Sequence, residues 1–269
     1  MPALYAHYHF GDKVINHLNP AIKKIIVENR QLFDIGVQGP DIFFYYQPLK
    51  SNPVSRFGIN MHNENASSFF DKMHLVYARY NGNKDALMAY LLGFACHYSL
   101  DYIDHPYIAE YMKEANVSHF AIESDYDRHL MHQDGHFNSC VDKIIPSIEN
   151  ASVIQSCFKD FSIKEVQKAI KGIRDYNVIL LSKSKIKFKS LFFIMKCIPF
   201  PELEDHLISP IKNPKCDKCN QHLDELEALA IKMFVEVSAN LFAYLNGQSD
   251  LSSRFNHTFD ELEVSEVFD

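Results

Sequence analysis

Apolar side chains recur along this chain at intervals of three and four residues, the spacing that places them on one face of a helix. One such series comprises Leu87, Tyr90, Leu91, Phe94 and Tyr98, and a second runs from Leu223 to Leu245. Further helices are predicted over 12–30, 65–80, 119–133, 137–147 and 163–182. Only nine glycines interrupt the sequence, which disfavours many short strands and turns. The pattern therefore predicts an all-α protein.

The distribution of polar residues indicates one domain followed by a charged tail. No internal repeat and no linker rich in proline, glycine and serine divides residues 1–247, so we assign them to a single domain. From residue 248 to residue 269 the chain carries six acids against one basic residue, Arg254. We expect this acidic C-terminal tail to be mobile or loosely attached.

The composition is that of a globular protein with a proper core, because 47% of the 269 residues are apolar. The formal net charge of -7 argues against broad nucleic-acid binding, unless a local basic patch or a metal ion reverses the field. The six cysteines are too sparse for a disulfide framework, and we expect them to be reduced.

No segment of the sequence resembles a secretory signal or a membrane span. The first residues, MPALYAHYHFGDKV, lack the basic start and the unbroken apolar run of such a signal. Apolar runs such as LFFIM at 191–195 fall short of the roughly 18 residues that a spanning helix needs. We therefore expect a cytoplasmic protein without a transmembrane segment.

Three histidines are followed by an acid four residues later, which places both side chains on one helix face, close enough to share a metal ion. The pairs are His97 with Asp101, His119 with Glu123, and His257 with Glu261. With 34 acids in the chain, chance gives roughly two such pairs among fourteen histidines. We take the third pair, in the acidic tail, as the chance example, and spacing alone does not establish a site.

The neighbours of the first two pairs strengthen the case for a metal site. His105 closely follows Asp101, while His7, Asp41 and His62 precede the pairs. Imidazoles with carboxylates are the ligands that zinc favours, and more than four of them implies more than one ion. The alternative is that these residues are helix caps, surface groups or hydrogen-bonded core residues, as most His and Asp side chains are.

Five segments of the first half of the chain resemble, in order and approximate spacing, the successive motifs of the zinc-dependent phospholipase C family. They are MPALYAHYHFG, GVQGPDIFFYY, MHNEN, LLGFACHYSLDYIDHPY and SHFAIESDYD. Proteins of that family are related in fold to P1-type nucleases. The resemblance implies a multi-helix bundle of the phospholipase C/P1 nuclease type.

The resemblance also implies a set of zinc ligands. His7 matches the N-terminal ligand better than His9, Asp41 matches a ligand that also orients or deprotonates water, and His62 matches the next ligand. His97 and Asp101 match a helical pair whose carboxylate bridges two ions. His105, His119 and Glu123 match the ligands of a further, more exposed zinc. The implied mechanism is attack by metal-activated water on a phosphodiester, with Asp41 as the catalytic residue.

One departure from the family affects the number of ions. Secreted relatives complete one zinc site with a processed N-terminal tryptophan, whereas this sequence contains no tryptophan. Backbone near the start of the chain or water would have to substitute, or the working site is dinuclear. We therefore expect two or three zinc ions.

Three functions remain open from the sequence. The first is a phospholipase C-like hydrolase that removes phospholipid head groups. The second keeps the chemistry but acts as a single-strand nuclease or nucleotide phosphodiesterase, and the third is a non-catalytic helical protein that metals stabilise and that binds a partner. The sequence does not specify the oligomeric state.

Several features beside the candidate ligands have two readings each. The aromatic run Phe43–Tyr46 either lines a groove or packs in the core. Alternating lysines at 183, 185, 187 and 189, just before LFFIM, suit contact with an anionic membrane surface or a solvated loop. Asp104, Asp125 and Asp127 either hold the second nitrogens of ligand histidines or are solvated. His129, His132 and His136 share a helical face if the preceding helix continues and could then form another metal site or a pH-sensitive patch, a reading that we do not favour. Cys216 and Cys219 with nearby His222 lack a fourth zinc ligand.

Overall fold

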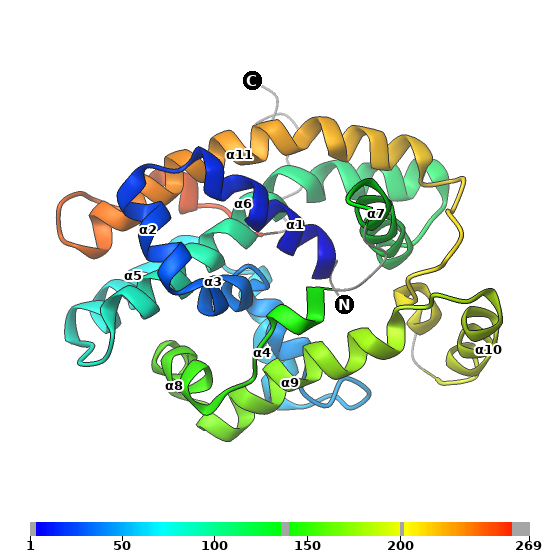
Figure 1. Cartoon of the computed structure of the whole chain (residues 1–269), viewed down its shortest axis with the longest axis horizontal. Coiled ribbons are helices and arrows are strands. Elements are labelled where there is room, and N and C mark those ends of the chain that lie inside the picture. Colours follow the sequence, from blue (N-terminus) through cyan, green and yellow to red (C-terminus); the bar gives the residue numbers. More distant parts are fainter. Residues whose placement is uncertain (1–3, 136–139, 200–201, 260–269) are drawn as a thin grey trace.

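The computed structural model describes residues 4–135, 140–199 and 202–259, and within these ranges the chain is helical (Figure 1). Eleven α-helices and five short 3-10 helices are present, and an isolated bridge between Leu181 and Ile208 is the sole β-type pairing in the described part. The all-α prediction is confirmed.

The helices follow one another through short connections. The first half contains α1 (Leu4–Val14), η1 (Ile15–His17), α2 (Pro20–Glu28), α3 (Arg30–Gly36), η2 (Gly39–Tyr45), α4 (Pro53–His62), α5 (Ala66–Arg79), α6 (Lys84–Ala115) and α7 (His119–Gln133). The second half contains η3 (Cys140–Lys143), α8 (Ile148–Cys157), α9 (Ile163–Leu180), α10 (Lys185–Lys196), η4 (Leu203–His206), α11 (Asp217–Leu245) and η5 (Ser253–Phe255).

Two predicted helices differ from the structure. The region 12–30 is not continuous, because Asn19 caps a new helix at Pro20 by accepting a hydrogen bond from the Ile22 amide at 3.0 Å. The helix predicted over 137–147 is wrong where it is described: only the 3-10 turn Cys140–Lys143 forms, and Pro146 disfavours helical backbone at the preceding residue. Residues 136–139 of that prediction lie outside the described ranges.

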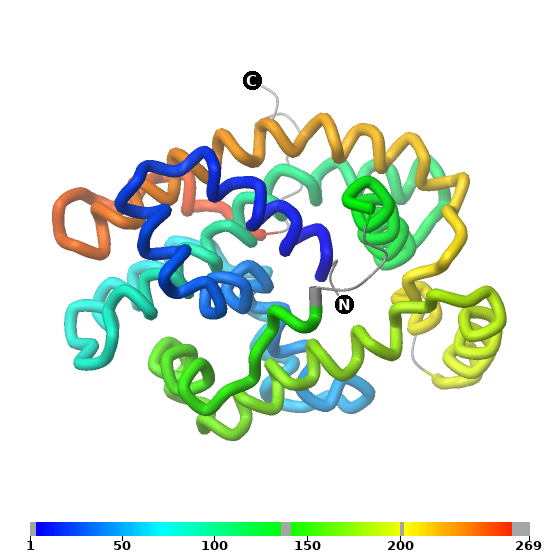
Figure 2. Tube along the Cα trace, viewed as in Figure 1, coloured from blue at the N-terminus to red at the C-terminus, as the bar shows by residue number. Residues whose placement is uncertain are grey.

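Helix α6 forms the centre of the bundle, with α11 along one side and α1, α3 and α7 around it (Figure 2). Its side chains are buried on nearly every face from Ala86 to Asp104, as expected for a helix enclosed by others. A continuous hydrophobic core joins these helices to α5, α8 and α9. The polar side chains of α6 that face inward therefore lie deep in the protein.

Two glycines let α3 and α6 approach to backbone contact. A Cβ atom added at Gly36 would lie 2.4 Å from the Tyr90 carbonyl oxygen, and one added at Gly93 would lie 2.5 Å from the Phe33 carbonyl oxygen. Only glycine fits at such a crossing. The close approach brings η2, which follows α3, against the middle of α6.

Residues 248–259 are not loosely attached, contrary to the expectation for the acidic tail. Phe255 and Phe259 are fully buried among the aromatic rings of the core. The Tyr98 hydroxyl donates a hydrogen bond to the Arg254 carbonyl, and the Ala66 amide donates one to the His257 carbonyl at 2.9 Å. The acidic composition did not predict this attachment, because the two phenylalanines that hold the segment in the core lie between the acidic residues.

Helix α11 is the one described helix that is long and apolar enough to cross a membrane by length and composition. The absence of long unbroken apolar runs did not reveal such a helix, because charged residues interrupt its sequence. In the structure its apolar stripe, including Leu223, Phe234 and Leu241, packs in the core, largely against α6. Core packing accounts for that stripe without a membrane, since a buried helix in a globular protein has the same composition.

The glycine crossing gives a test of the bundle. Gly93→Ala is expected to lower the free energy of unfolding by about 1–3 kcal/mol, because the added methyl group meets backbone atoms that cannot move independently. Urea denaturation measures the change. Gly82→Ala is the control, because its Cβ would meet only the far end of the Tyr80 side chain at an exposed position. Equal effects of the two substitutions would contradict this account of the crossing.

Candidate metal centre

All eight residues proposed as ligands meet at the centre of the bundle, although they come from five separate elements. They are His7 from α1, Asp41 from η2, His62 from α4, His97, Asp101 and His105 from α6, and His119 and Glu123 from α7. Their ligand atoms form three groups, each within 4.8 Å: His7, His97 and Asp101; Asp41, His62 and His97; and His105, His119 and Glu123. Each group has the donor set of a zinc site.

Helix α6 supplies the line along which the three groups are arranged. His97, Asp101 and His105 are spaced four residues apart, so they project from one face. Asp101 Oδ2 lies 2.9 Å from His97 Nε2, and Asp101 Oδ1 lies 3.6 Å from His105 Nε2. The Asp101 carboxylate therefore lies between the side chains of His97 and His105.

The tight turn before η2 brings Asp41 to this line. Gly39 has a positive φ of 50°, and an added Cβ would lie 2.2 Å from the His97 ring, so no larger residue fits. Two residues later, Asp41 Oδ1 lies 3.0 Å from His62 Nε2, and Oδ2 lies 3.9 Å from His97 Nε2. The glycine of the GPD segment thus lets the aspartate reach both imidazoles.

A hydrogen bond at Nδ1 of His62 directs its Nε2 towards Asp41. His62 Nδ1 lies 2.8 Å from the Gly58 carbonyl oxygen, which can only accept a hydrogen bond, so Nδ1 carries the proton. In the neutral ring Nε2 then presents a lone pair to the Asp41 carboxylate. Two electron-rich groups at that distance require a cation between or beside them, either a proton or a metal ion.

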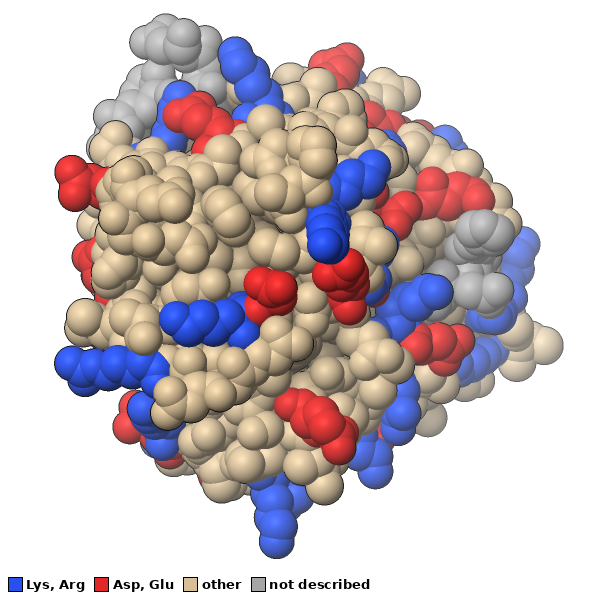
Figure 3. Space-filling model, turned by 60° about the vertical axis from the view of Figure 1, so that its left-hand side comes forward, with Lys and Arg blue, Asp and Glu red and all other residues tan. Residues whose placement is uncertain are grey.

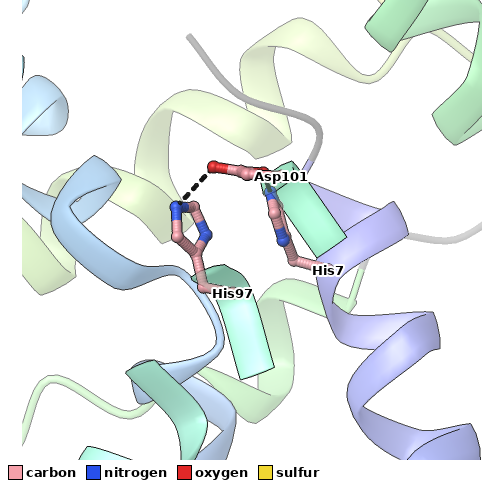
Figure 4. A group of neighbouring side chains, drawn as sticks. All are labelled: His7, His97 and Asp101. Carbon is pink, nitrogen blue, oxygen red and sulfur yellow. Dashed lines mark ion pairs between the residues drawn. The ribbon is translucent and has the colours of Figure 1, made fainter. Parts of the chain in front are cut away.

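Helix α1 is fixed by a carboxylate so that His7 faces Asp101. The amides of Tyr5 and Ala6 donate hydrogen bonds to Asp127, at 3.1 and 2.8 Å, at the N-terminal end of α1 where no intrahelical acceptor exists. His7 Nε2 lies 3.3 Å from Asp101 Oδ1, and the His7 ring stacks on that of His97 with centroids 4.3 Å apart (Figure 4).

A sharp turn between α6 and α7 builds the third group. Asn116 adopts a left-handed conformation, and Ser118 caps α7 by accepting a hydrogen bond from the Ala121 amide. Glu123 Oε1 consequently lies 2.9 Å from His119 Nε2 and 3.8 Å from His105 Nε2. The side chain of His119 is 29% exposed, which makes this the most accessible of the three groups.

Burial and mutual proximity together lower the pKa of Asp101, Glu123 and His7. Burial by itself would raise the pKa of Asp101, but His97, His105 and His7 together hold it well below its usual range. Burial likewise opposes ionisation of Glu123, yet His119 and His105 lower its pKa. Burial and the neighbouring His97 lower the pKa of His7 to about 4. An ionised carboxylate beside a neutral imidazole, as at Asp101 and His7, is the combination that metal binding requires.

The surroundings of the eight side chains fit zinc. His97 is fully buried, its Nδ1 has no hydrogen-bond partner, and its Nε2 faces the Asp101 carboxylate at 2.9 Å, where a proton or a metal ion would complete the contact. His7 Nδ1 is similarly buried and without a hydrogen-bond partner. The single Nε2 of His97 belongs to two of the three groups, and one nitrogen binds one ion, so the side chains alone do not set the number of ions.

His9 lies outside the centre, as the choice of His7 predicts. Its Nδ1 is 2.7 Å from Asp134 Oδ2 and its Nε2 is 3.3 Å from Glu227 Oε1, so it ties α1 to α11 and to the residue that follows α7. The second histidine cluster also differs from a metal site. His129 Nε2 contacts Asp224 at 2.8 Å, and His136 lies outside the described residues.

The three acids considered as histidine partners are all buried, so the solvated reading is wrong. Asp125 binds the Arg128 guanidinium, the Asn213 amide and the Asn220 side chain, while Asp127 caps α1. Burial raises the pKa of Asp104 well above its usual value, although His105 opposes the shift. The partner of His62 is a main-chain carbonyl instead, a contact that no sequence motif announces.

Aromatic side chains close the centre on one side. Phe44 stacks on the His62 ring at a centroid distance of 5.3 Å, and Phe259 packs on both His62 and His97, at 5.4 and 5.8 Å. Phe43 and Tyr45 are buried in the core, which confirms the packing role for these two members of the aromatic run. No sequence pattern pointed to Phe259, because it lies far along the chain in a segment that is rich in acidic residues.

Cys216 and Cys219 are both buried, and burial raises the pKa of each to about 12. The His222 ring packs on Tyr107 instead of joining them. No group of metal-binding side chains forms there among the described residues.

Fold and site together define an all-α protein with buried imidazoles and carboxylates able to hold metal ions. Residues 6–172 match the family model described as zinc dependent phospholipase C. The chain belongs to this family, which is zinc-dependent, and the matched range contains all eight candidate ligands while α10 and α11 lie beyond it. Comparisons with curated proteins and with solved structures give no significant match.

Asp101→Asn is expected to weaken zinc binding at two groups together, because the carboxylate contacts His7, His97 and His105. Glu123→Gln should loosen mainly the exposed group. Losing a direct ligand should weaken binding by at least about tenfold, the lower bound for second-shell losses. Zinc content after dialysis measures this. Wild-type zinc content in Asp101→Asn would contradict the assignment.

His9→Gln is expected to destabilise the protein more near pH 6 than near pH 8.5. Burial opposes the charged form of His9, but Glu227 and Asp134 outweigh it and raise the pKa. The ion pairs therefore contribute fully below the unfolded value of about 6.5 and are lost as pH rises through the folded value. Allowing for screening by solvent, we expect a difference of about 1 kcal/mol by urea denaturation.

The exposed His17 provides the control for this measurement, because its replacement by Gln removes no ion pair found in the described structure. A loss of stability in His9→Gln that is the same at both pH values would argue against the ion-pair account.

Proposed function

We propose that the chain is a zinc-dependent phosphodiester hydrolase that removes phospholipid head groups in the manner of phospholipase C. The observation that carries the proposal is the position of Asp101, whose oxygens lie within 3.6 Å of three imidazoles. A carboxylate at that junction is suited to bridge cations. Family membership over residues 6–172 supports the same chemistry.

Bound zinc would supply Lewis acidity, which neutralises phosphate oxygens and makes an attacking water more acidic. His62, His97 and Asp41 would hold one ion, His7 and Asp101 a second, and His105, His119 and Glu123 a third. In this assignment His97 belongs to the group of Asp41 and His62, and Asp101 belongs to the group of His7.

The side chains have separable tasks in such a reaction. Asp41 Oδ1 faces His62, whereas Oδ2 is 3.9 Å from His97 and is the oxygen better placed to orient water and accept its proton. Phe44 and Phe259 exclude bulk water from this side, which strengthens electrostatic interactions inside. The exposed His119 group is the natural place for the departing oxygen of the substrate.

Asp41→Asn is expected to lower kcat/KM for a soluble chromogenic phosphodiester by about 100-fold or more, since the amide cannot accept the proton of water. Zinc content is measured in parallel to separate chemistry from metal loss. Asp160→Asn is the matched control, because Asp160 is exposed and lies far along the sequence from every candidate ligand. An unchanged rate in Asp41→Asn would contradict its proposed role.

The substrate class is tested by comparing phosphatidylcholine micelles with single-stranded DNA. Release of the phosphorylated head group from the micelles supports the phospholipase, and preferential cleavage of DNA favours the nuclease alternative. Full zinc loading without hydrolysis of several lipid head groups and nucleotides would overturn the enzymatic proposal and favour a metal-stabilised binding protein.

A further inference from the structure

Helix α10 differs from the rest of the bundle because most of its surface is exposed. Its inward side contributes Met195, Leu191 and Phe188 to a small cluster that is separate from the main core. Figure 1 shows α10 at the edge of the molecule, away from α6 and α11. The helix is attached to the protein along one face only.

The segment around α10 carries one sign of charge. Between Asp175 and Glu202 the sequence has five lysines and no acid, in a chain whose formal net charge is -7. Over most of the face drawn in Figure 3, by contrast, the two signs are mixed. The segment is therefore a local basic region on an acidic protein, and it attracts an anionic surface.

The exposed side of α10 combines lysines with large apolar side chains. Lys185, Lys189 and Lys196 follow one another at intervals of four and seven residues, so they form one stripe along the helix. Ile186 and Phe193, seven residues apart, form the adjoining stripe and are 80% and 71% exposed. Isolated exposed apolar residues are common, but two of this size beside a row of lysines make an amphipathic surface.

Lys187 is the one lysine of α10 that does not belong to this surface. Its Nζ donates hydrogen bonds to the carbonyls of Leu181 and Val178, at 2.9 and 3.3 Å, and so helps to hold α10 on the end of α9. The remaining lysines of the helix have no such contact among the interactions of the described residues. They are available to a partner.

Helix α10 is coupled to the exposed part of the metal centre through η4. The side chains of Leu203 and Leu207 pack beneath α10, while Asp205 accepts hydrogen bonds from Ser118 and, through its carbonyl, from Ser124. Ser118 is the N-cap of α7 and immediately precedes His119. A surface that binds α10 is thus connected by two short contacts to the most accessible ligand group.

We propose that α10 is a membrane-interface element, which docks the protein on an anionic phospholipid surface with its lysines at the head groups and Ile186 and Phe193 inserted between them. The lipid surface is favoured over single-stranded nucleic acid because the apolar stripe suits insertion, whereas nucleic acid needs several exposed stacking rings. This inference adds to the proposed function the surface on which the protein would meet its lipid substrate. The connection to catalysis rests on the proposed function, whereas the membrane binding does not.

Binding is tested by sedimentation with vesicles of phosphatidylglycerol and phosphatidylcholine, using full-length Asp41→Asn protein so that the lipid is not consumed. Neutralising the three lysines of the stripe to Gln should weaken binding about 100-fold, at about fivefold per lysine. Ile186→Ser with Phe193→Ser should abolish the binding that persists at high salt. Vesicles of phosphatidylcholine alone should bind weakly.

The control neutralises Lys24, Lys72 and Lys232, which lie exposed on α2, α5 and α11, and it should leave vesicle binding unchanged. Both sets of lysine substitutions are also made in the otherwise wild-type chain. Their hydrolysis of a soluble chromogenic diester then shows whether the substitutions disturb the active centre, independently of vesicle binding. Vesicle binding that survives loss of the stripe, or that falls equally in the control, overturns the proposal. Stripe-dependent binding to single-stranded DNA instead of vesicles also overturns it.

The two proposals fail in different ways. Stripe-dependent vesicle binding without diester hydrolysis by the wild-type chain would retain the membrane element and reject the hydrolase. Hydrolysis without vesicle binding would retain the hydrolase and reject the membrane element.

Discussion

The structure depends on the burial of three carboxylates among five imidazoles at the centre of a helical bundle. Removing such groups from water costs several kcal/mol for each charge unless opposite charges and hydrogen bonds compensate. Here Asp101 contacts three histidines, and Asp41 and Glu123 each contact two. The buried Nδ1 atoms of His97 and His7 have no hydrogen-bond partner, so the side chains do not complete this compensation themselves. Cations at the centre would do so and would join five separate elements.

The rest of the fold provides the geometry for that cluster. The glycine crossing of α3 and α6 brings η2 close enough for Asp41 to reach α6, and Gly39 leaves space for the His97 ring. Asp127 holds α1 by its amides, while the turn at Asn116 returns α7 beside α6. These contacts involve backbone atoms, so the positions of the ligands are set by main-chain packing and depend little on the flexibility of their own side chains.

Sequence reasoning predicted most of the helices because they leave local patterns, and spacing together with the family's motifs named the eight candidate ligands that the structure brings together. The series from Leu87 to Tyr98 and the pairs at i and i+4 are repeated within one helix, where spacing fixes direction. It failed where the deciding partner lies far away in the chain. Asp127 reaches α1 across more than a hundred residues, and Phe259 reaches His62 from the other end of the sequence. At 137–147 the error was local, since Pro146 should have ended the predicted helix.

The packing of Phe259 on His62 and His97 bears on the order in which the centre is enclosed during biosynthesis. Ribosomes release the chain from its N-terminal end, so every candidate ligand emerges well before Phe259 does. Until then the ring that covers the two imidazoles is missing. The enclosure of this side of the centre is therefore completed only when almost the whole chain of 269 residues has been made.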